Sequence, residues 1–387
     1  MSTEFRIEGG RALIDGAFVE TTIDVESQTG TIAEIGRNGT QRRTLDGEGL
    51  MVLPGIVDIH GDAFERQMMP RPKVDFPIDV ALIDTDRQVI ANGITTVFHG
   101  VTWSWEPGLR GPKNARDMLD AMERLRPRLA ADTRYHLRHE TYNLDAEAEI
   151  AEWLHDRRIG LLAFNDHMTS IVQSKDRAHK IASMVPRSGL STAEFEQLVE
   201  RVVRRDNEVP SSIARLAEIA VANGIPILSH DDASPDQRRW YRSLGCKLSE
   251  FPVTVETAEE AARESDDIIF GAPNVVRGGS HTGWTKASDM IAQGLCSVLA
   301  SDYYYPAPLL AAFRLAADGT LPFEKAWTLV SEAPARAAGL ADRGRIAQGQ
   351  RADLILVDAE GERPRVVATI VAGRIVHMTD ADRLLRS

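Results

Sequence analysis

Histidine and carboxylate residues follow several short apolar stretches in the middle of the chain. The six that could hold metal ions are His60, Asp62, Glu140, His167, His230 and Asp302. Imidazole nitrogen and carboxylate oxygen suit zinc and similar divalent ions without any thiolate. We expect two divalent cations, zinc first and manganese or iron as alternatives, which activate a water molecule for hydrolysis. In this set Glu140 would bridge the ions, and Asp302 would accept the proton of the attacking water.

Each of these residues also has a structural explanation. A single histidine at a strand end is more often a hydrogen-bonded packing residue, and an aspartate such as Asp302 often caps the following helix. Glu140 could pair with its neighbour Arg138 instead of a metal, and Asp166 competes with His167 as a ligand. His99 has either a substrate role or a structural one. The convergence of six such residues on one predicted rim favours the metal site.

The elements that must position these residues alternate between two kinds. Segments 113–130, 192–206 and 211–223 have apolar residues at helical spacing, and short apolar segments stand between such helices. The eight expected strands are GIVDIH, ITTVFHGV, RYHLRHETY, GLLAFNDH, IPILSHDD, CKLSEFPV, IIFGAPN and CSVLASDY. This pattern predicts an α/β fold, a (β/α)8 TIM-like barrel, whose catalytic residues gather at the C-terminal ends of the strands.

Both ends of the chain are rich in short β segments separated by turns. The stretches FRIEGG, ALIDGAFVE, TIAEIG and MVLP precede the barrel, and GRIAQGQRADLILVD and RVVATIVAGRIV follow it. We therefore predict one small β-sandwich domain made of residues 1–54 and 344–387, beside a barrel of residues 55–343. The closing DADRLLRS is expected to be a short helix or a frayed tail.

The composition of the chain indicates which kinds of molecule the protein is expected to bind. The 387 residues carry a formal net charge of -12, which disfavours a nucleic-acid partner because phosphate backbones select basic surfaces. The two cysteines form no CxxC motif. No apolar run reaches the length of a membrane span, and MSTEFRIEGG lacks the features of a signal peptide. We expect a cytoplasmic protein that binds a small molecule and neither nucleic acid nor membrane.

The run LPGIVDIHGDAFERQMMPRPKVDFP resembles the start of the barrel in one branch of the amidohydrolase superfamily. These are the phosphonate-catabolism enzymes called alpha-D-ribose 1-methylphosphonate 5-triphosphate diphosphatases. The likeness continues in order through HLRHE, SHDDASP, SEFPVT, GAPNVVRGGSHTG, SDYYYPAPLLAAF and DRGRIAQGQRADLILV, over nearly the whole chain. That family also places HxD on the first strand, in agreement with His60 and Asp62.

The resemblance implies hydrolysis of a phosphoanhydride by a metal-bound hydroxide, giving the ribose 5-phosphate and pyrophosphate. His281 would act as a catalytic donor to the leaving pyrophosphate. The residues that would hold phosphate oxygens are Arg71, Lys73, Arg277, Gly278, Gly279 and Ser280. Without the resemblance, Arg71 is explained as a surface residue and the Gly-Gly-Ser turn as a plain loop. Barrels of this type also suggest a homodimer.

Two loops on the substrate face depart from the family pattern. After the second strand the chain has HGVTWSWEPGLRG, where the family carries an aspartate and a glycine-rich loop. After the fourth strand it has NDHMTSIVQ, where the family shows proline, glycine and glutamine. An amidohydrolase that cleaves a C–N bond of a cyclic amide, N-acyl or deaminase substrate is therefore the alternative function. A non-catalytic relative that has lost its ligands is disfavoured by the six candidate ligands.

Overall fold

The computed structural model describes residues 5–36, 43–279 and 286–385. Its central sheet has eight parallel strands that pair in chain order. They are β8 (Ile56–Gly61), β9 (Ile94–Trp103), β10 (Asp132–Glu140), β11 (Leu161–Asn165), β12 (Ile227–His230), β13 (Leu248–Glu250), β14 (Asp267–Gly271) and β15 (Val298–Ala300). An isolated parallel bridge between Gly61 and Asp302 joins the first strand to the end of the last. The sheet is thus a nearly closed barrel, and the predicted fold class is confirmed.

Apolar side chains from different strands fill the inside of the barrel. One cluster of buried residues combines Val57, Ile59, Phe98, Leu161, Ala163, Leu228, Leu248, Ile269, Val298 and Ala300. Strands buried on both faces need such near-continuous apolar stretches, which is why the sequence pattern predicted them. Five strands nevertheless carry a histidine, glutamate or asparagine side chain in their last or second-last position, where the loops begin: His60, Glu140, Asn165, His230 and Glu250.

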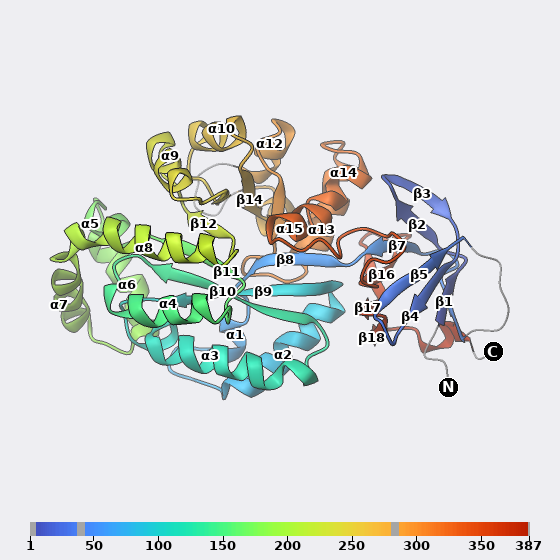
Figure 1. Cartoon of the computed structure of the whole chain (residues 1–387), viewed down its shortest axis with the longest axis horizontal. Coiled ribbons are helices and arrows are strands. Elements are labelled where there is room, and N and C mark those ends of the chain that lie inside the picture. The colour runs from blue at the N-terminus through green and yellow to red at the C-terminus, as the bar shows by residue number, and fades with distance from the viewer. Residues whose placement is uncertain (1–4, 37–42, 280–285, 386–387) are drawn as a thin grey trace.

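Helices surround the barrel on the left and centre of Figure 1. The longer ones are α2 (Ile78–Ala91), α3 (Pro112–Leu125), α4 (Glu147–His155), α6 (Arg177–Ser188), α7 (Thr192–Val203), α8 (Val209–Ala222), α9 (Pro235–Ser243), α10 (Val255–Arg263) and α13 (Ala307–Ala317). Shorter ones are α1 (Glu65–Met68), α5 (His167–Val172), α11 (Ala272–Arg277), α12 (Ala287–Ala292), α14 (Phe323–Thr328) and α15 (Glu332–Ala337). Helices α3, α7 and α8 confirm the three segments with helical spacing. Helices α5, α6 and α7 form an insertion between β11 and α8.

Two further sheets lie beside the barrel, at the right of Figure 1. Their strands are β1 (Phe5–Glu8), β2 (Arg11–Ile14), β3 (Ala17–Glu20), β4 (Ile23–Glu26), β5 (Thr31–Ile35), β6 (Arg43–Asp46), β7 (Met51–Pro54), β16 (Leu354–Asp358), β17 (Arg365–Val371), β18 (Arg374–Met378) and β19 (Leu384–Leu385). The two ends of the chain meet where β7 pairs antiparallel with β16. Both ends therefore build the small β domain, as expected, and its boundaries at 54 and 344 stay a prediction.

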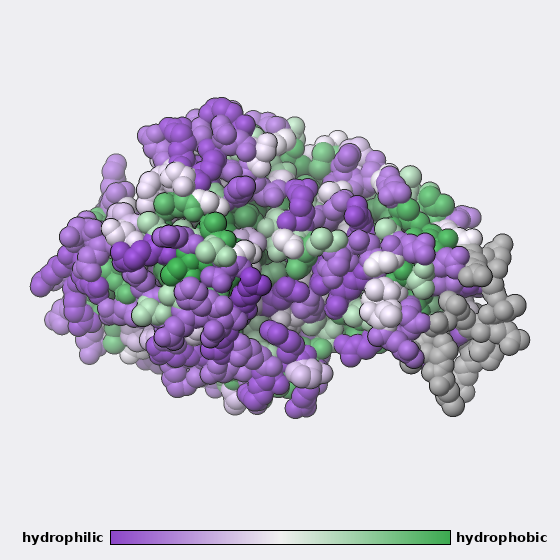
Figure 2. Space-filling view, in the orientation of Figure 1, coloured by the Kyte–Doolittle hydropathy of each residue, from purple (hydrophilic) through white to green (hydrophobic). Residues whose placement is uncertain are grey.

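The described part of the closing segment, up to residue 385, is ordered as a turn and a short strand. Residues Ala381–Arg383 form a single 3-10 turn, and β19 then pairs antiparallel with β6. Hydrophilic residues dominate the face in Figure 2, whereas hydrophobic residues gather around α14, β2 and β3. Within the described part of the chain, no helix is both long and apolar enough to cross a membrane.

Candidate active site

Three of the predicted ligands meet where the first and last barrel strands come together. Ligand atoms of His60, Asp62 and Asp302 all lie within 4.8 Å of one another. The backbone fixes this arrangement, because the Asp302 amide donates to the His60 carbonyl at 2.9 Å and the Asp62 amide donates to the Asp302 carbonyl at 3.0 Å. Asp302 adopts a left-handed φ of 54°, a conformation that non-glycine residues rarely hold without such constraints.

The two carboxylates of this group repel each other. Burial, followed by the charge of Asp62, raises the pKa of Asp302 to about 7. A divalent cation between Asp62 and Asp302 would remove that repulsion and favour both charged forms. Carboxylate oxygens beside an imidazole are also the donor set that zinc and similar ions take. The residues present therefore fit a divalent cation.

Glu250, at the end of β13, lies between two of the predicted histidine ligands. Its carboxylate accepts hydrogen bonds from Nδ1 of His60 at 2.7 Å and Nδ1 of His230 at 2.6 Å. The side chain is fully buried. Burial alone would raise its pKa, but the interactions with His60 and His230 hold the pKa of Glu250 well below its ordinary value. With Nδ1–H donated to Glu250, Nε2 of each imidazole carries no proton and keeps the lone pair that a metal would bind.

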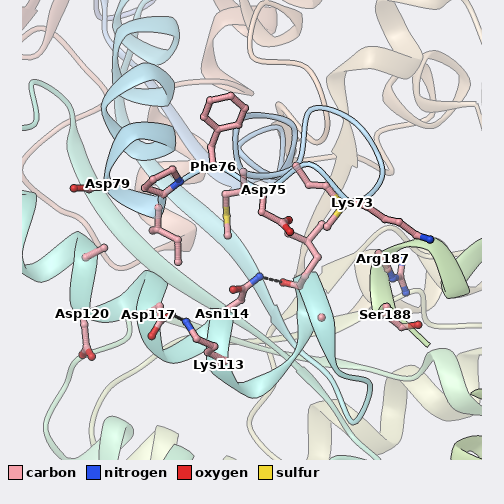
Figure 3. A pocket seen from close by; sticks show the side chains of 18 of the residues that line it. Lys73, Asp75, Phe76, Asp79, Lys113, Asn114, Asp117, Asp120, Arg187 and Ser188 are labelled. Atoms are coloured by element: carbon pink, nitrogen blue, oxygen red, sulfur yellow. Dashed lines mark hydrogen bonds and ion pairs between the residues drawn. The ribbon is translucent and has the colours of Figure 1, made fainter.

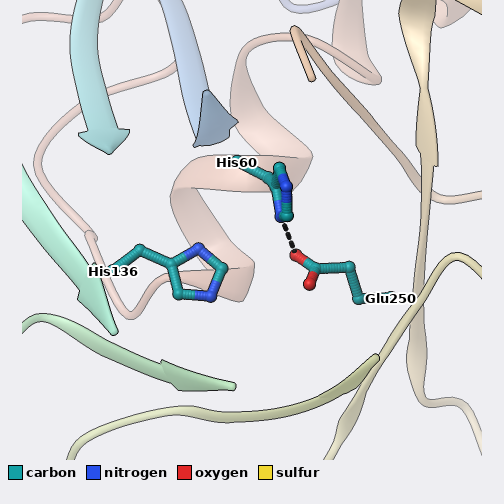
Figure 4. A group of neighbouring side chains, drawn as sticks. All are labelled: His60, His136 and Glu250. Atoms are coloured by element: carbon teal, nitrogen blue, oxygen red, sulfur yellow. Dashed lines mark hydrogen bonds and ion pairs between the residues drawn. The ribbon is translucent and has the colours of Figure 1, made fainter. Parts of the chain in front are cut away.

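His136 belongs to the same cluster. Ligand atoms of His60, His136 and Glu250 lie within 4.8 Å of one another, and Figure 4 shows the His136 ring turned toward the other two side chains. Nδ1 donates to the Ile59 carbonyl at 2.9 Å. Burial lowers the pKa of His136 to about 3, so the ring is neutral. Its buried Nε2 is an acceptor without a hydrogen-bond partner among the described residues.

Arg138 places a buried positive charge between the candidate ligands. One terminal nitrogen donates to Asp62 at 3.2 Å, and the other lies 3.3 Å from Nε2 of His230. Because a guanidinium only donates, His230 must accept through Nε2, which agrees with its Nδ1–H bond to Glu250. Gly100 on β9 makes room for this side chain, since an added Cβ there would lie 3.2 Å from Cδ of Arg138.

Glu140 and His167 form a pair of their own. The Glu140 carboxylate accepts from Nδ1 of His167 and, at 3.3 Å, from its backbone amide. Burial alone would raise the pKa of Glu140, but the contacts with His167 lower it below the ordinary value. His167 is the first residue of α5 rather than the last of β11. The competing ligand Asp166 caps that helix by accepting from the Thr169 amide at 2.8 Å.

The remaining polar residues near the strand ends have structural contacts. Asp232 is buried against Arg238, with an ion pair of 3.2 Å, and the cap of α9 is Ser234 rather than an aspartate. His99 lies inside β9, because that strand runs on to Trp103. Burial lowers the pKa of His99 to about 3, so the ring is neutral. The ion pair with Arg238 favours a structural role for Asp232, and the buried position inside β9 favours a structural role for His99.

The predicted phosphate-binding residues are dispersed. Arg71 and Lys73 lie in the exposed segment 70–77. Lys73 lines the cavity of about 850 Å³ drawn in Figure 3, whose described lining includes Arg187 but none of the six candidate ligands. A second cavity, of about 470 Å³, borders His167 and His230 directly.

The turn after α11 lies closer to the last barrel strand. Arg277 ends this helix and donates to the hydroxyl of Tyr303 at 3.3 Å, next in sequence to Asp302. Gly278 follows in the left-handed conformation, with a φ of 79°, and Gly279 comes next. Ser280 and His281 lie outside the described residues. Their predicted roles, like those of the other site residues, stay predictions.

The sequence did not point to Glu250. It suggested His136 only as a residue that packs beside Glu140 or supports it, and Arg138 only as a partner of Glu140. Glu250 ends a barrel strand, as Glu140 and His230 do, so the same strand-end rule applied to the sixth strand would have found it. His136, Arg138 and Glu140 alternate along β10, and alternate residues of a strand share a face. The alternation along this strand could therefore have shown that His136 and Arg138 lie on the same face as Glu140.

Comparison with known proteins identifies the family of this chain. The amidohydrolase family profile matches residues 51–376. The chain is 35% identical over 345 residues to alpha-D-ribose 1-methylphosphonate 5-triphosphate diphosphatase of Escherichia coli (strain K12), covering 86% of this chain and 90% of that protein. Among solved structures, dihydropyrimidinase from Brevibacillus agri NCHU1002 has a TM-score of 0.67 at 12% identity, covering 97% of this chain and 95% of that one.

A second solved structure, the beta-aspartyl dipeptidase of Fervidobacterium islandicum AW-1, has a TM-score of 0.62 at 16% identity and covers 100% of this chain and 99% of that one. At such low identities these two structures support the fold alone. The profile match spans most of the chain, and the relative from Escherichia coli aligns over nearly its whole length. The chain therefore belongs to the amidohydrolase family, a family of metal-dependent hydrolases.

Proposed function

We propose that the protein hydrolyses a phosphoanhydride, converting alpha-D-ribose 1-methylphosphonate 5-triphosphate to the 5-phosphate and pyrophosphate. The observation that carries this proposal is the 35% identity to the diphosphatase of Escherichia coli over 86% of the chain. The cluster of histidines and carboxylates at the barrel mouth supplies ligands for the cations that such a reaction requires.

The proposed ligands of two divalent ions, zinc or else manganese or iron, are His60, Asp62, Glu140, His167, His230 and Asp302, with Glu140 as the bridge. When bound, such ions polarise phosphoryl oxygens and lower the pKa of water. Glu250 orients the imidazoles of His60 and His230 by accepting a hydrogen bond from Nδ1–H of each ring. That arrangement directs Nε2 of both rings away from Glu250.

Asp302 is the proposed proton acceptor. Water adds to one phosphorus of the α–β anhydride while the bond from that phosphorus to the bridging oxygen breaks. The bridging oxygen leaves with the other phosphoryl group. One proton of the water passes to the Asp302 carboxylate and from there to solvent. The Asp302 carboxylate lies within 4.8 Å of the ligand atoms of His60 and Asp62, where it could accept a proton from water held at this cluster.

A substrate screen with and without metal tests the proposed function. The zinc- or manganese-loaded enzyme is expected to release pyrophosphate from phosphoribosyl triphosphates. Chelation is expected to abolish this release, and added metal to restore it, because the buried carboxylates need the cation charge. N-acyl and cyclic-amide substrates are assayed in parallel. Amide hydrolysis without pyrophosphate release would contradict the proposal and favour C–N bond cleavage.

Arg277→Ala tests the turn after α11. The guanidinium lies beside Tyr303, next to the proposed base, where it can contact a phosphate oxygen. Loss of one charge-assisted hydrogen bond is expected to raise KM for the triphosphate about tenfold with little change in kcat. Steady-state kinetics measures both constants. An unchanged KM would show that Arg277 does not bind the phosphate.

The homodimer and the cytoplasmic location stay predictions.

A further inference from the structure

Two cations from a single helix line the cavity beside the candidate metal ligands. Lys180 and Arg187 both belong to α6, and both line the cavity of about 470 Å³ that also borders His167 and His230. This volume lies within the range of pockets that bind small ligands. Cationic side chains in a cavity next to a cluster of metal ligands are the arrangement that a polyphosphate needs.

Lys180 is held by one hydrogen bond to the backbone, and this bond leaves its positive charge unpaired. Its Nζ donates one hydrogen bond, of 3.0 Å, to the backbone carbonyl of Ser170 at the start of the same insertion. No carboxylate forms an ion pair with Lys180 among the described residues. An ammonium has three donors, so two hydrogens of Lys180 are left for a ligand. The side chain is half-buried, which reduces the screening of its charge by water.

Arg187 is held in place by a buried carboxylate. Its Nε donates to Glu106 at 2.8 Å, and the Glu106 side chain is only 1% exposed. The Arg187 side chain is 25% exposed. Its two terminal nitrogens have no hydrogen-bond partner in the described part of the chain. The guanidinium is therefore oriented through Nε, and the end that suits bidentate contact with a phosphate is left available.

The backbone supports this position as well. Gly108, in the loop after β9, packs so closely against α6 that an added Cβ would lie 2.1 Å from the carbonyl oxygen of Arg187. Arg187 also lines the larger cavity, where Figure 3 shows it on the same side as Lys73. Arg187 thus lies between the two cavities, fixed by the loop after the second barrel strand.

We propose that Lys180 and Arg187 bind phosphate oxygens of the substrate, so that helix α6 carries a polyphosphate subsite. This inference rests on the proposed function, since it names the part of the site that holds the phosphate chain. The subsite adds two fixed positive charges to an otherwise acidic protein, next to the residues that perform the hydrolysis.

Direct binding of inorganic pyrophosphate to the metal-loaded, full-length enzyme tests the subsite. Lys180→Met and Arg187→Gln are each expected to weaken pyrophosphate binding about 10- to 100-fold by isothermal titration calorimetry, because each loses a charge-assisted contact. The same variants are expected to raise KM for the triphosphate and to leave kcat nearly unchanged. Lys175→Met is the matched control, since Lys175 is exposed in the same insertion and lies outside the cavity lining.

Arg187→Gln leaves Glu106 buried without its partner, so the double variant Glu106→Gln/Arg187→Gln is measured beside it. Loss of pyrophosphate binding in Lys180→Met and in the double variant, with binding kept in Lys175→Met, supports the subsite. Unchanged binding in both, or no binding by the unmodified enzyme, overturns it. The titration needs no turnover. An enzyme that releases no pyrophosphate from triphosphates but still binds pyrophosphate through Lys180 would contradict the proposed function alone.

Discussion

Asp302→Asn is expected to lower kcat about a thousandfold while the fold and most of the bound metal remain. The amide has nearly the shape of the carboxylate and keeps one oxygen as a ligand, but it cannot accept the proton of water. Single-turnover kinetics measures the loss, and elemental analysis measures the metal. Asp289→Asn, which alters an exposed carboxylate in the first turn of α12, is the control and should retain full activity.

Although Asp302→Asn lowers activity, it is expected to stabilise the metal-free protein near neutral pH. The pKa of Asp302 is raised from 3.8 to about 7 in the folded state, first by burial and then by the charge of Asp62. The unfolded chain therefore gives up this proton at lower pH, and the stability linked to Asp302 is lost as pH rises from about 4 to about 7. Asp302→Asn should remove this loss in metal-free thermal melts. Unchanged turnover, or a variant that does not fold, would contradict the role of Asp302.

Glu250→Gln is expected to weaken metal binding about 10- to 100-fold and to lower activity at limiting metal. A carboxylate accepts from Nδ1 of His60 and of His230 at once, whereas an amide has one acceptor oxygen and a nitrogen that only donates. One imidazole must then place its proton on Nε2, the atom needed for the metal. Competition with a fluorescent chelator measures the affinity.

Excess metal separates the two ways in which Glu250→Gln could act. If Glu250 only orients the histidines, saturating metal should restore much of kcat. Glu256→Gln changes an exposed glutamate in the first turn of α10 and is expected to leave the affinity as it is. Equal affinities of Glu250→Gln and the unmodified enzyme would show that the carboxylate has no part in ligand orientation.

The barrel was predictable because its signal is local. Most strands are short apolar stretches with a polar residue at or next to the end, and the segments between them show helical periodicity. The position of His167 was less predictable. Asp166 caps a helix that starts one residue after it, so the chain leaves β11 at Asn165 and His167 begins α5. Whether such a residue ends the strand or begins the helix depends on hydrogen bonds such as the one from the Thr169 amide to Asp166. The periodicity of the sequence does not reveal these bonds.

The cluster around Glu250 was harder to predict because its contacts join distant segments. Glu250 meets His60, which is 190 residues away in sequence, and His230, which is 20 away. A glutamate before Phe251 and Pro252 could equally face solvent. Likewise, the pairing of Arg187 with Glu106 joins helix α6 to the loop after β9, two segments that have no shared pattern in the sequence. Such pairs depend on how the barrel brings its loops together.

The bridge between Gly61 and Asp302 joins the first barrel strand to the end of the last. Contacts between residues so far apart in sequence form late in folding. The chain loses conformational entropy when the long loop closes, before the new contacts can stabilise it. A growing chain on the ribosome therefore holds His60 and Asp62 long before their partner Asp302 has been synthesised. The proposed cation site of His60, Asp62 and Asp302 is therefore complete only once the last barrel strand has joined the first.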